Sequence, residues 1–222
     1  MNIKRKILAK GHRNRPGYVM KPKGVLFHTT NNWNDGAGDE MHGIYMSTTN
    51  RVVSWHVTVD KDSATQHIPF NENAWHAGDG TNGEYNRNWI GVEIACEAVD
   101  PGDPLDEATY QNAVEVVAQI MNQHGFTSAS QLQPHAIVYG KNCPHHTLFD
   151  RNQFKSDVLK KVNQVSEKFT DVKKNRWSYE AIQQVAEKGW MIGYPNKKFK
   201  PSKAVTREEL AAVLYNIWKG EQ

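Results

Sequence analysis

Residues 90–96 read IGVEIAC, a run rich in β-branched residues that is typical of a buried strand. Side chains alternate between the two faces of a strand. The bulky apolar residues therefore share one face with Cys96, whereas Glu93 lies on the other face between Gly91 and Ala95. Because only small residues flank it on that face, the carboxylate of Glu93 has room for another group beside it.

Two further stretches, residues 25–30 (VLFHTT) and 52–60 (VVSWHVTVD), are predicted strands. A helix is expected downstream of them. Asp103 suits its N-cap, Pro104 its first turn and Gly125 its C-terminal stop, with apolar residues at helical spacing in between. Strands mixed with amphipathic helices indicate an α/β domain.

The sequence changes character after this domain, which we expect over residues 1–162. Residues 163–168 are polar and are predicted to be a linker, and residues 169–222 are predicted to form a small, mainly helical module. Within that module, Thr206 and Glu209 precede an apolar run in the pattern of a capping box, which predicts the start of a helix.

Charge also separates the two regions. Residues 169–222 hold 10 Lys and Arg against 6 Asp and Glu, a net charge of +4, whereas the first 168 residues hold 17 against 18, a net charge of −1. A basic module favours an anionic surface as its target. The alternative is a solvated helical hairpin whose lysines only keep it soluble.

The composition excludes several classes of protein. The 222 residues carry 27 Lys and Arg against 24 Asp and Glu, which is too balanced for a dedicated nucleic-acid binder, and they contain no glycine-rich phosphate loop. No apolar run approaches the roughly 20 residues that span a bilayer, so membrane insertion is not expected. Residues 1–10 (MNIKRKILAK) are basic, but the polar residues 11–16 (GHRNRP) follow, so we expect no secretory signal peptide.

Metal-binding side chains occur in two places. His28 ends the first predicted strand, and His135 and Cys143 lie within residues 134–146 (PHAIVYGKNCPHH). Two imidazoles and a thiolate suit zinc, and three protein ligands leave a fourth position for water, as in catalytic zinc sites. In a chain with 10 histidines this spacing is a weak signal on its own.

Four motifs occur in the order found in one protein family: residues 25–28 (VLFH), 75–78 (WHAG), 90–94 (IGVEI) and, after His135, 140–144 (GKNCP). In these motifs the chain resembles the type 2 N-acetylmuramoyl-L-alanine amidases. That zinc amidase family includes phage endolysins and relatives of the peptidoglycan-recognition proteins. The resemblance covers most of residues 20–150 and implies a mixed central sheet with flanking helices.

By this resemblance, His28, His135 and Cys143 align with the ligands of one Zn²⁺ per chain. Glu93 aligns with the catalytic carboxylate of the family, and Lys141 with a lysine two residues before the last ligand. Zinc lowers the pKa of a bound water to about 7 and polarises the scissile carbonyl. Glu93 would then pass the water proton to the leaving amine, and Lys141 would stabilise the oxyanion. A strand carboxylate facing solvent is the alternative for Glu93.

Cys96, the other of the two cysteines, is expected to behave as a small hydrophobic residue. A disulfide between Cys96 and Cys143 is the competing account, and it would remove a zinc ligand. The expected lack of a signal peptide, with the cytosolic origin that it implies, argues against this disulfide.

The sequence departs from the family at Trp55, which precedes His56 where many relatives carry a catalytic tyrosine. An indole has no acidic hydroxyl, so Trp55 is expected to pack or to stack on a sugar. Together with Trp55, we regard Trp75, His76 and Asp79 as candidates for substrate binding. Structural hydrogen bonding is the alternative for His56 and His76.

The tail resembles one S-layer homology module over nearly its whole length. The motifs that carry this resemblance are residues 169–172 (FTDV), 177–182 (WSYEAI), 193–195 (GYP), 199–201 (FKP) and 206–209 (TREE). Such modules hold proteins on anionic secondary cell-wall polymers, commonly as three copies. A single copy implies either weak binding or the assembly of three chains. Trp177 and Arg207 are expected to contact the polymer, with internal packing and capping as the alternative.

The two resemblances together imply a peptidoglycan hydrolase that cleaves the amide bond between N-acetylmuramic acid and L-alanine and is anchored to the wall by its tail. Without a signal peptide, we expect a phage or prophage endolysin that is made in the cytoplasm and acts at the bacterial cell wall after release. Two alternatives stay open: a non-catalytic peptidoglycan-recognition protein and a zinc endopeptidase of peptidoglycan.

Overall fold

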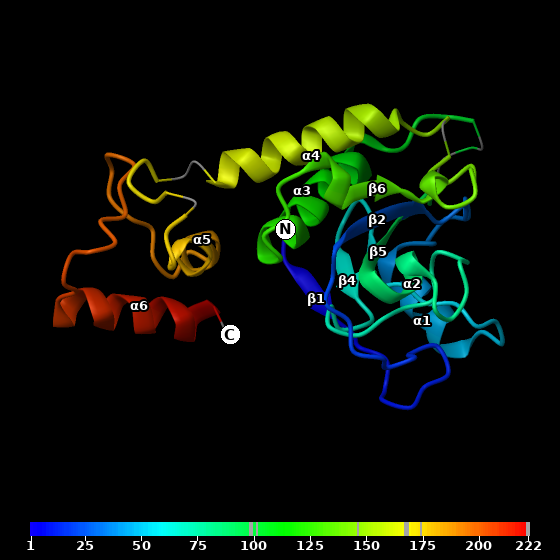
Figure 1. Ribbon diagram of the computed structural model, residues 1–222, viewed down its shortest axis with the longest axis horizontal. Coiled ribbons are helices and arrows are strands. Elements are labelled where there is room, and N and C mark those ends of the chain that lie inside the picture. Colours follow the sequence, from blue (N-terminus) through cyan, green and yellow to red (C-terminus); the bar gives the residue numbers. More distant parts are fainter. Residues whose placement is uncertain (98–99, 101, 146, 167–168, 174, 221–222) are drawn as a thin grey trace. The chain divides into compact units, whose positions relative to one another are not determined.

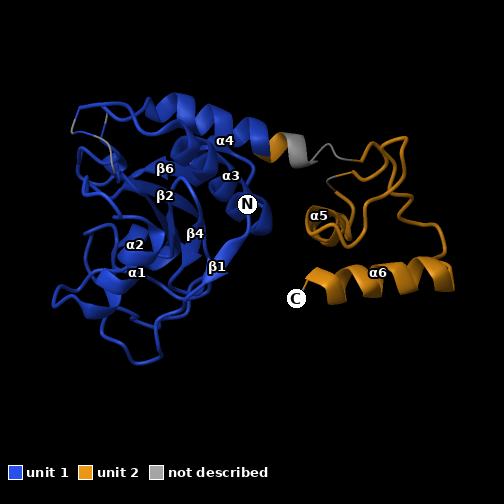
Figure 2. Cartoon of the chain, turned by 180° about the vertical axis from the view of Figure 1, so that it is seen from behind, with its two compact units in different colours: residues 1–161 blue, residues 162–222 orange. Residues whose placement is uncertain are grey.

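The structure is a computed structural model that describes residues 1–97, 100, 102–145, 147–166, 169–173 and 175–220. It divides into two compact units, Met1–Lys161 and Val162–Gln222 (Figure 2). Helix α4 (Arg151–Ser166) continues past this division, so residues 163–166 of the expected linker are helical. Residues 167 and 168 of that linker lie outside the described residues.

Within its described residues, unit 1 is built on a six-stranded sheet with the order β1-β4-β3-β5-β2-β6. The strands are β1 (Ile3–Arg5), β2 (Gly24–Thr29), β3 (Val57–Val59), β4 (Ala64–Gln66), β5 (Trp89–Ile94) and β6 (Leu132–Pro134). β3 and β4 are antiparallel, and the other neighbours are parallel. The expected mixed sheet is therefore confirmed.

The strand predicted over residues 52–60 is shorter in the structure, where β3 begins at Val57. The backbone N–H of His56, directly before β3, still donates to the carbonyl of Gly91 in β5, but two N–H groups earlier in the predicted strand bond to loops. Val53 N–H donates to Asn14 Oδ1, and Ser54 N–H donates to the carbonyl of Trp75. Composition alone does not reveal these partners, because they lie far away in the sequence.

Helices cover both faces of the sheet (Figure 1). α3 (Glu107–Gln123) and α4 lie on one side, and α1 (Asp39–Thr48) and α2 (Glu84–Asn88) lie on the other. Phe27 of β2 contacts Phe154 of α4, with ring centroids 4.9 Å apart. Because side chains alternate along a strand, His28 points away from this apolar core, toward the opposite face of the sheet.

Helix α3 begins later than predicted. Its N-cap is Asp106, whose Oδ1 accepts the backbone N–H of Thr109 at 3.0 Å, so the prediction that Asp103 caps this helix is wrong. Both aspartates precede the apolar run, but an N-cap must reach an unpaired N–H of the first turn. Gly125, with a φ of +68°, follows the end of the helix as predicted.

The carboxyl ends of three adjacent strands meet at one edge of the sheet, because β5, β2 and β6 are neighbours and parallel. His28 lies near the end of β2 and pairs in register with Glu93 of β5. His135 directly follows β6 and begins the 3₁₀ helix η2 (His135–Ile137). This edge is where open parallel sheets bind their ligands.

Unit 2 contains α5 (Tyr179–Glu187) and α6 (Arg207–Gly220). Its small core consists of Phe169, Val172, Ile182 and Ala186. The predicted capping box is present, because Thr206 Oγ1 accepts the N–H of Glu209 and Glu209 Oε2 accepts the N–H of Thr206. In neither unit is a described helix long and apolar enough to cross a membrane.

Candidate active site

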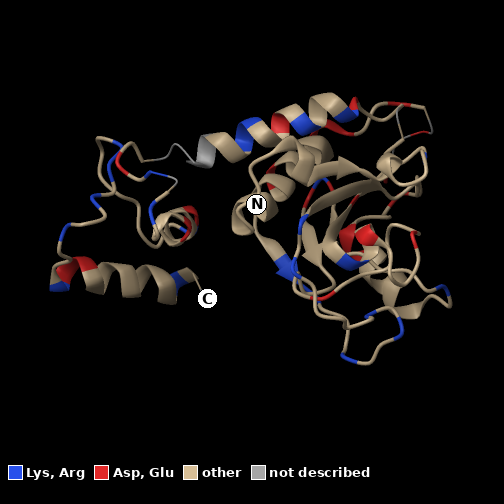
Figure 3. Cartoon of the chain, in the orientation of Figure 1, with Lys and Arg blue, Asp and Glu red and all other residues tan. Residues whose placement is uncertain are grey.

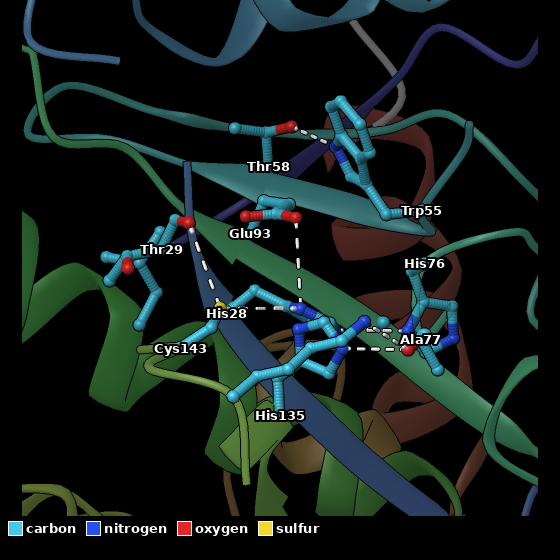
Figure 4. Close-up of polar contacts among 12 residues, drawn as sticks. His28, Thr29, Trp55, Thr58, His76, Ala77, Glu93, His135 and Cys143 are labelled. Atoms are coloured by element: carbon cyan, nitrogen blue, oxygen red, sulfur yellow. Dashed lines mark hydrogen bonds and ion pairs between the residues drawn. The ribbon is translucent and has the colours of Figure 1, made fainter. Parts of the chain in front are cut away.

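Three side chains of types that can bind a metal come from separate segments and meet at the carboxyl edge of the sheet. The donor atoms of His28, His135 and Cys143 all lie within 4.8 Å of one another. His28 comes from β2, His135 from the start of η2 and Cys143 from the loop that follows (Figure 4). The structure thus brings together the three ligands that the sequence suggested.

The chemistry of this donor set fits zinc. His28 Nδ1 lies 3.8 Å from Cys143 Sγ, and the rings of His28 and His135 have centroids 4.3 Å apart. Burial, and to a smaller extent the nearby His76, holds the pKa of His28 well below its ordinary value. The imidazole is therefore neutral, which is the form that binds a metal. Three protein donors leave a fourth tetrahedral position open.

Both cysteines are free thiols, so Cys96 and Cys143 form no disulfide with each other. Burial, with a further contribution from Glu93, raises the pKa of the Cys143 thiol to about 12. The thiol therefore keeps its proton until a cation displaces it, as expected of a buried metal ligand. Cys96 is fully buried, in keeping with the small hydrophobic residue that we expected.

Glu93 projects from β5 beside the three donors. Its Oε1 lies 4.0 Å from His28 Nδ1, and its Oε2 is buried with no hydrogen-bond partner among the described residues. The side chain is only 14% exposed, which argues against a carboxylate that simply faces solvent. Burial raises the pKa of Glu93 to about 8, so this carboxyl group can both take up and release a proton near neutral pH.

A groove of about 630 Å³ opens beside Glu93. The side chains that line it come from the loop after β2, from α1, and from Val53 and Trp55 just ahead of β3. This volume is within the range of ligand-binding sites. The carboxyl group of Glu93 thus faces a space in which a substrate can lie.

Trp55 lines this groove and is only 5% exposed. Its indole N–H donates to Thr58 Oγ1 at 2.7 Å, so the polar atom of the side chain is paired inside the protein and the ring is left for packing (Figure 4). Trp75 lies edge-on against Tyr18, with ring centroids 6.4 Å apart, and is not among the described residues that line the groove.

His76 and Asp79, two further candidates for substrate binding, make hydrogen bonds inside the protein. The ring nitrogens of His76 lie 3.0 Å from His28 Nε2 and 3.1 Å from the carbonyl oxygen of Trp89. The two carboxylate oxygens of Asp79 accept backbone N–H groups near the start of α2, at 2.7 and 3.2 Å. Both side chains therefore have structural partners inside the protein, those of His76 in β2 and β5 and those of Asp79 in α2.

Lys141 belongs to the same loop region. Its Nζ donates to the carbonyl oxygen of Ala77 at 3.1 Å and passes close over Gly78, where a Cβ would lie 2.6 Å from Nζ. The same carbonyl oxygen lies 2.8 Å from His135 Nε2. Sequence reasoning missed Ala77 because it acts through a carbonyl oxygen, a group that every residue has and no motif reveals.

In unit 2, the two predicted wall-binding residues are both exposed: Trp177 is 93% exposed, and Arg207 is the first residue of α6. A groove of about 380 Å³ occurs elsewhere in this unit, with Tyr194, Lys200 and Lys203 in its lining. Trp177 and Arg207 are not among the described residues that line it.

The comparisons with known proteins agree with this geometry. Residues 18–146 match the family described as N-acetylmuramoyl-L-alanine amidase, and residues 168–211 match the S-layer homology domain. The chain therefore belongs to the N-acetylmuramoyl-L-alanine amidase family, as its sequence motifs suggested.

Individual relatives are named N-acetylmuramoyl-L-alanine amidases. CwlH of Bacillus subtilis (strain 168) is 39% identical over 158 residues, which is 71% of this chain and 61% of CwlH. XlyA of the same organism is 40% identical over 158 residues, 71% of this chain and 51% of XlyA. The chain thus spans between about half and three fifths of the length of these two relatives.

Solved structures match the same region. The catalytic domain of XlyA superposes with a TM-score of 0.65 at 37% identity, covering 71% of this chain and 99% of that domain. The structure of PlyL superposes with a TM-score of 0.63 at 37% identity, covering 71% of this chain and 97% of PlyL. The mixed α/β fold of unit 1 is therefore that of these proteins.

Proposed function

We propose that this chain is a zinc-dependent peptidoglycan hydrolase that cleaves the amide bond between N-acetylmuramic acid and L-alanine. One observation carries the proposal: the donors of His28, His135 and Cys143 converge next to the buried Glu93, which faces a groove. Membership of the family and the names of its relatives support the choice of bond.

The residues around the donor set have different roles in hydrolysis. The chemistry that zinc supplies when bound is Lewis acidity toward the scissile carbonyl and toward water. Glu93 receives a proton from the attacking water and delivers it to the nitrogen of L-alanine, so the amine leaves neutral as the C–N bond breaks. Burial raises the pKa of Glu93 to about 8 in the metal-free protein, and the positive charge of a bound ion would lower it toward neutrality, which suits both steps.

Lys141 and Trp55 complete this assignment. The ammonium group of Lys141 stabilises the negative charge that develops on the carbonyl oxygen. The resemblance, which aligns Lys141 with the lysine two residues before the last ligand, supports this role, and in this structure its Nζ donates to the carbonyl of Ala77 at 3.1 Å. Trp55 borders the groove with its ring and offers an apolar surface to a sugar, since its N–H is already paired with Thr58.

Digestion of purified cell walls by the zinc-loaded protein tests the proposal. We expect new amino termini of L-alanine, released in step with the loss of peptide from muramic acid. Binding to walls without any new termini would support the recognition-only alternative. New termini at other residues, with the muramoyl–alanine bond intact, would identify an endopeptidase. Glu93→Gln is the matched control for contaminating hydrolases.

We further propose that residues 169–222 hold the protein on an anionic secondary cell-wall polymer, so that it acts at the bacterial wall as a phage or prophage endolysin. The match to the S-layer homology domain supports this anchoring role. Basic residues also gather in the segment between α5 and α6 (Figure 3), and two of them, Lys200 and Lys203, line the groove of unit 2 together with Tyr194. A cationic groove with an aromatic wall suits an acidic saccharide.

Cosedimentation of the full chain with walls measures this anchoring. We expect binding to weaken as NaCl rises, because ion pairs with an acidic polymer are screened. The variants Arg207→Gln and Trp177→Ala test the residues chosen from the sequence, and Lys200→Gln tests the groove. Binding that no variant and no salt concentration changes would contradict an electrostatic anchor.

Self-association of three chains through the tail stays a prediction. The apolar side chains that α6 leaves exposed support it, since Leu214 and Trp218 are more than half exposed in unit 2. Sedimentation equilibrium measures the mass directly, and a monomer at all concentrations would contradict the prediction.

A further inference from the structure

Two consecutive residues of the loop at residues 75–78 make hydrogen bonds to the imidazoles of His28 and His135. His76 Nδ1 lies 3.0 Å from His28 Nε2, and the carbonyl oxygen of Ala77 lies 2.8 Å from His135 Nε2. Figure 4 shows these two contacts on the side of the imidazoles away from Cys143. Each imidazole is therefore held at the ring nitrogen that does not face the other donors.

The partners of His76 determine where its proton lies. Its Nε2 is 3.1 Å from the carbonyl oxygen of Trp89, and a carbonyl can only accept, so Nε2 carries the proton. Nδ1 of His76 is then an acceptor, which makes His28 Nε2 the donor. The lone pair of His28 is left on Nδ1, the nitrogen 3.8 Å from Cys143 Sγ.

The same reasoning applies to His135. Its Nε2 faces the carbonyl oxygen of Ala77 and must donate to it, so the lone pair of His135 is on Nδ1 as well. Two adjacent residues of one loop thus select the same tautomer in both imidazoles. A protonated nitrogen cannot bind a metal, so this selection decides which atom of each ring can be a ligand.

Asn86 of α2 fixes this loop. Its Oδ1 accepts two consecutive backbone N–H groups, those of His76 at 2.9 Å and Ala77 at 2.8 Å. Its Nδ2 donates to the carbonyl of Gly80 at 3.1 Å, which determines the orientation of the amide. The side chain is nearly inaccessible, because Asn86 is 3% exposed. The side-chain amide of Asn86 therefore fixes the backbone of His76 and Ala77, the two residues that bond to the histidine donors.

We propose that His76, the carbonyl of Ala77 and Asn86 form a positioning unit that presents Nδ1 of His28 and Nδ1 of His135 to the metal. The inference rests on the metal centre of the proposed function, but not on which bond is cleaved. His76 is then a positioning residue that acts through His28, and not a contact of the substrate. Outer partners of this kind typically contribute about 10–100-fold to metal affinity.

Three variants of the full chain test this role. His76→Leu removes the acceptor, and His76→Asn restores an acceptor oxygen close to the position of Nδ1. His67→Leu is the matched control, because His67 is also buried in unit 1 but its Nε2 pairs with Thr58 Oγ1. Zinc affinity is measured by competition with a chelator, and the geometry of the centre by the visible spectrum of the Co²⁺-loaded protein.

We expect His76→Leu to bind zinc about 10–100-fold more weakly and to shift the Co²⁺ spectrum. His76→Asn is expected to recover most of both, and His67→Leu to keep the wild-type values. Wild-type zinc affinity in His76→Leu, or equal losses in His76→Leu and His67→Leu, would overturn the proposal.

A measurement on the unmodified chain keeps the proposal testable even where a variant fails to fold. Long-range ¹⁵N–¹H correlation spectra of the zinc-loaded protein report which ring nitrogens carry protons. We expect protonated Nε2 in His28, His76 and His135, and zinc on Nδ1 of His28 and His135. Zinc on Nε2 of either ring would overturn the positioning unit. A protein with the expected tautomers but no amidase activity would overturn the proposed reaction and leave this inference standing.

Discussion

Replacing Gly91 by alanine is expected to weaken zinc binding without changing any zinc ligand. A Cβ on Gly91 would lie 2.6 Å from Cγ and 2.7 Å from Nδ1 of His76, which is closer than such atoms approach in folded proteins. The backbone cannot easily yield, because the N–H of Gly91 donates to His56 Nδ1 at 2.9 Å within the central strand β5. The ring of His76 must therefore move away from His28.

The size of the effect follows from this overlap. Overpacking of a buried site costs about 1–3 kcal/mol of stability, which urea unfolding of the metal-free protein measures. Loss of the hydrogen bond from His28 to His76 is expected to lower zinc affinity about 10–100-fold, measured by chelator competition.

Gly43→Ala is the control for this experiment. A Cβ on Gly43 would lie 2.9 Å from Cε1 of His67, so it presses on a buried histidine that pairs with Thr58 and not with a zinc donor. We expect Gly43→Ala to keep the zinc affinity of the wild type. If Gly91→Ala kept it too, the steric reasoning would be refuted.

Other perturbations separate the roles of single residues. Glu93→Gln should keep its zinc and lose about 10²–10⁴-fold in the release of L-alanine termini, because an amide cannot accept the water proton; near-normal rates would reassign the proton transfer. Cys143→Ser should lower the zinc content measured by atomic absorption, and full occupancy would remove Cys143 from the ligand set. Burial lowers the pKa values of His56 and His67 from 6.5 to about 4, so the unfolded chain takes up protons first as the pH falls. Stability of the metal-free protein is then complete above pH 6.5 and decreases toward pH 4, by up to about 3 kcal/mol for each histidine. A urea midpoint that stays constant over this range would contradict these shifts.

The sequence predicted which strands and helices unit 1 contains better than it predicted the residues at which they begin and end. β5 and β2 follow from runs of β-branched residues, and the resemblance implied the mixed sheet. The cap of α3 was misplaced, because Asp103 and Asp106 are chemically alike and only the folded turn brings Thr109 N–H to one of them. Residues 52–56 have the composition of a strand, but the backbone N–H groups of Val53 and Ser54 bond to Asn14 and to the carbonyl of Trp75, which lie in distant loops.

The parts of the site that depend on the type of side chain could be predicted from the sequence. The parts that depend on which segments the fold brings together could not. The donor types of His28, His135 and Cys143 can be recognised in the sequence, although their convergence depends on β5, β2 and β6 being neighbours. The role of Asn86 could not be predicted, because a single asparagine in a short helix belongs to no motif. Only the folded structure brings two backbone N–H groups to its Oδ1.

The carbonyl oxygen of Ala77 has a consequence for how variants of this loop behave. One oxygen receives both the imidazole of His135 and the ammonium of Lys141. Removing the ammonium would leave that oxygen to a single donor, and we expect the remaining hydrogen bond from His135 to become shorter and stronger. In the proposed mechanism Lys141 also stabilises the oxyanion, so a substitution of Lys141 is expected to change zinc affinity as well as the rate of hydrolysis.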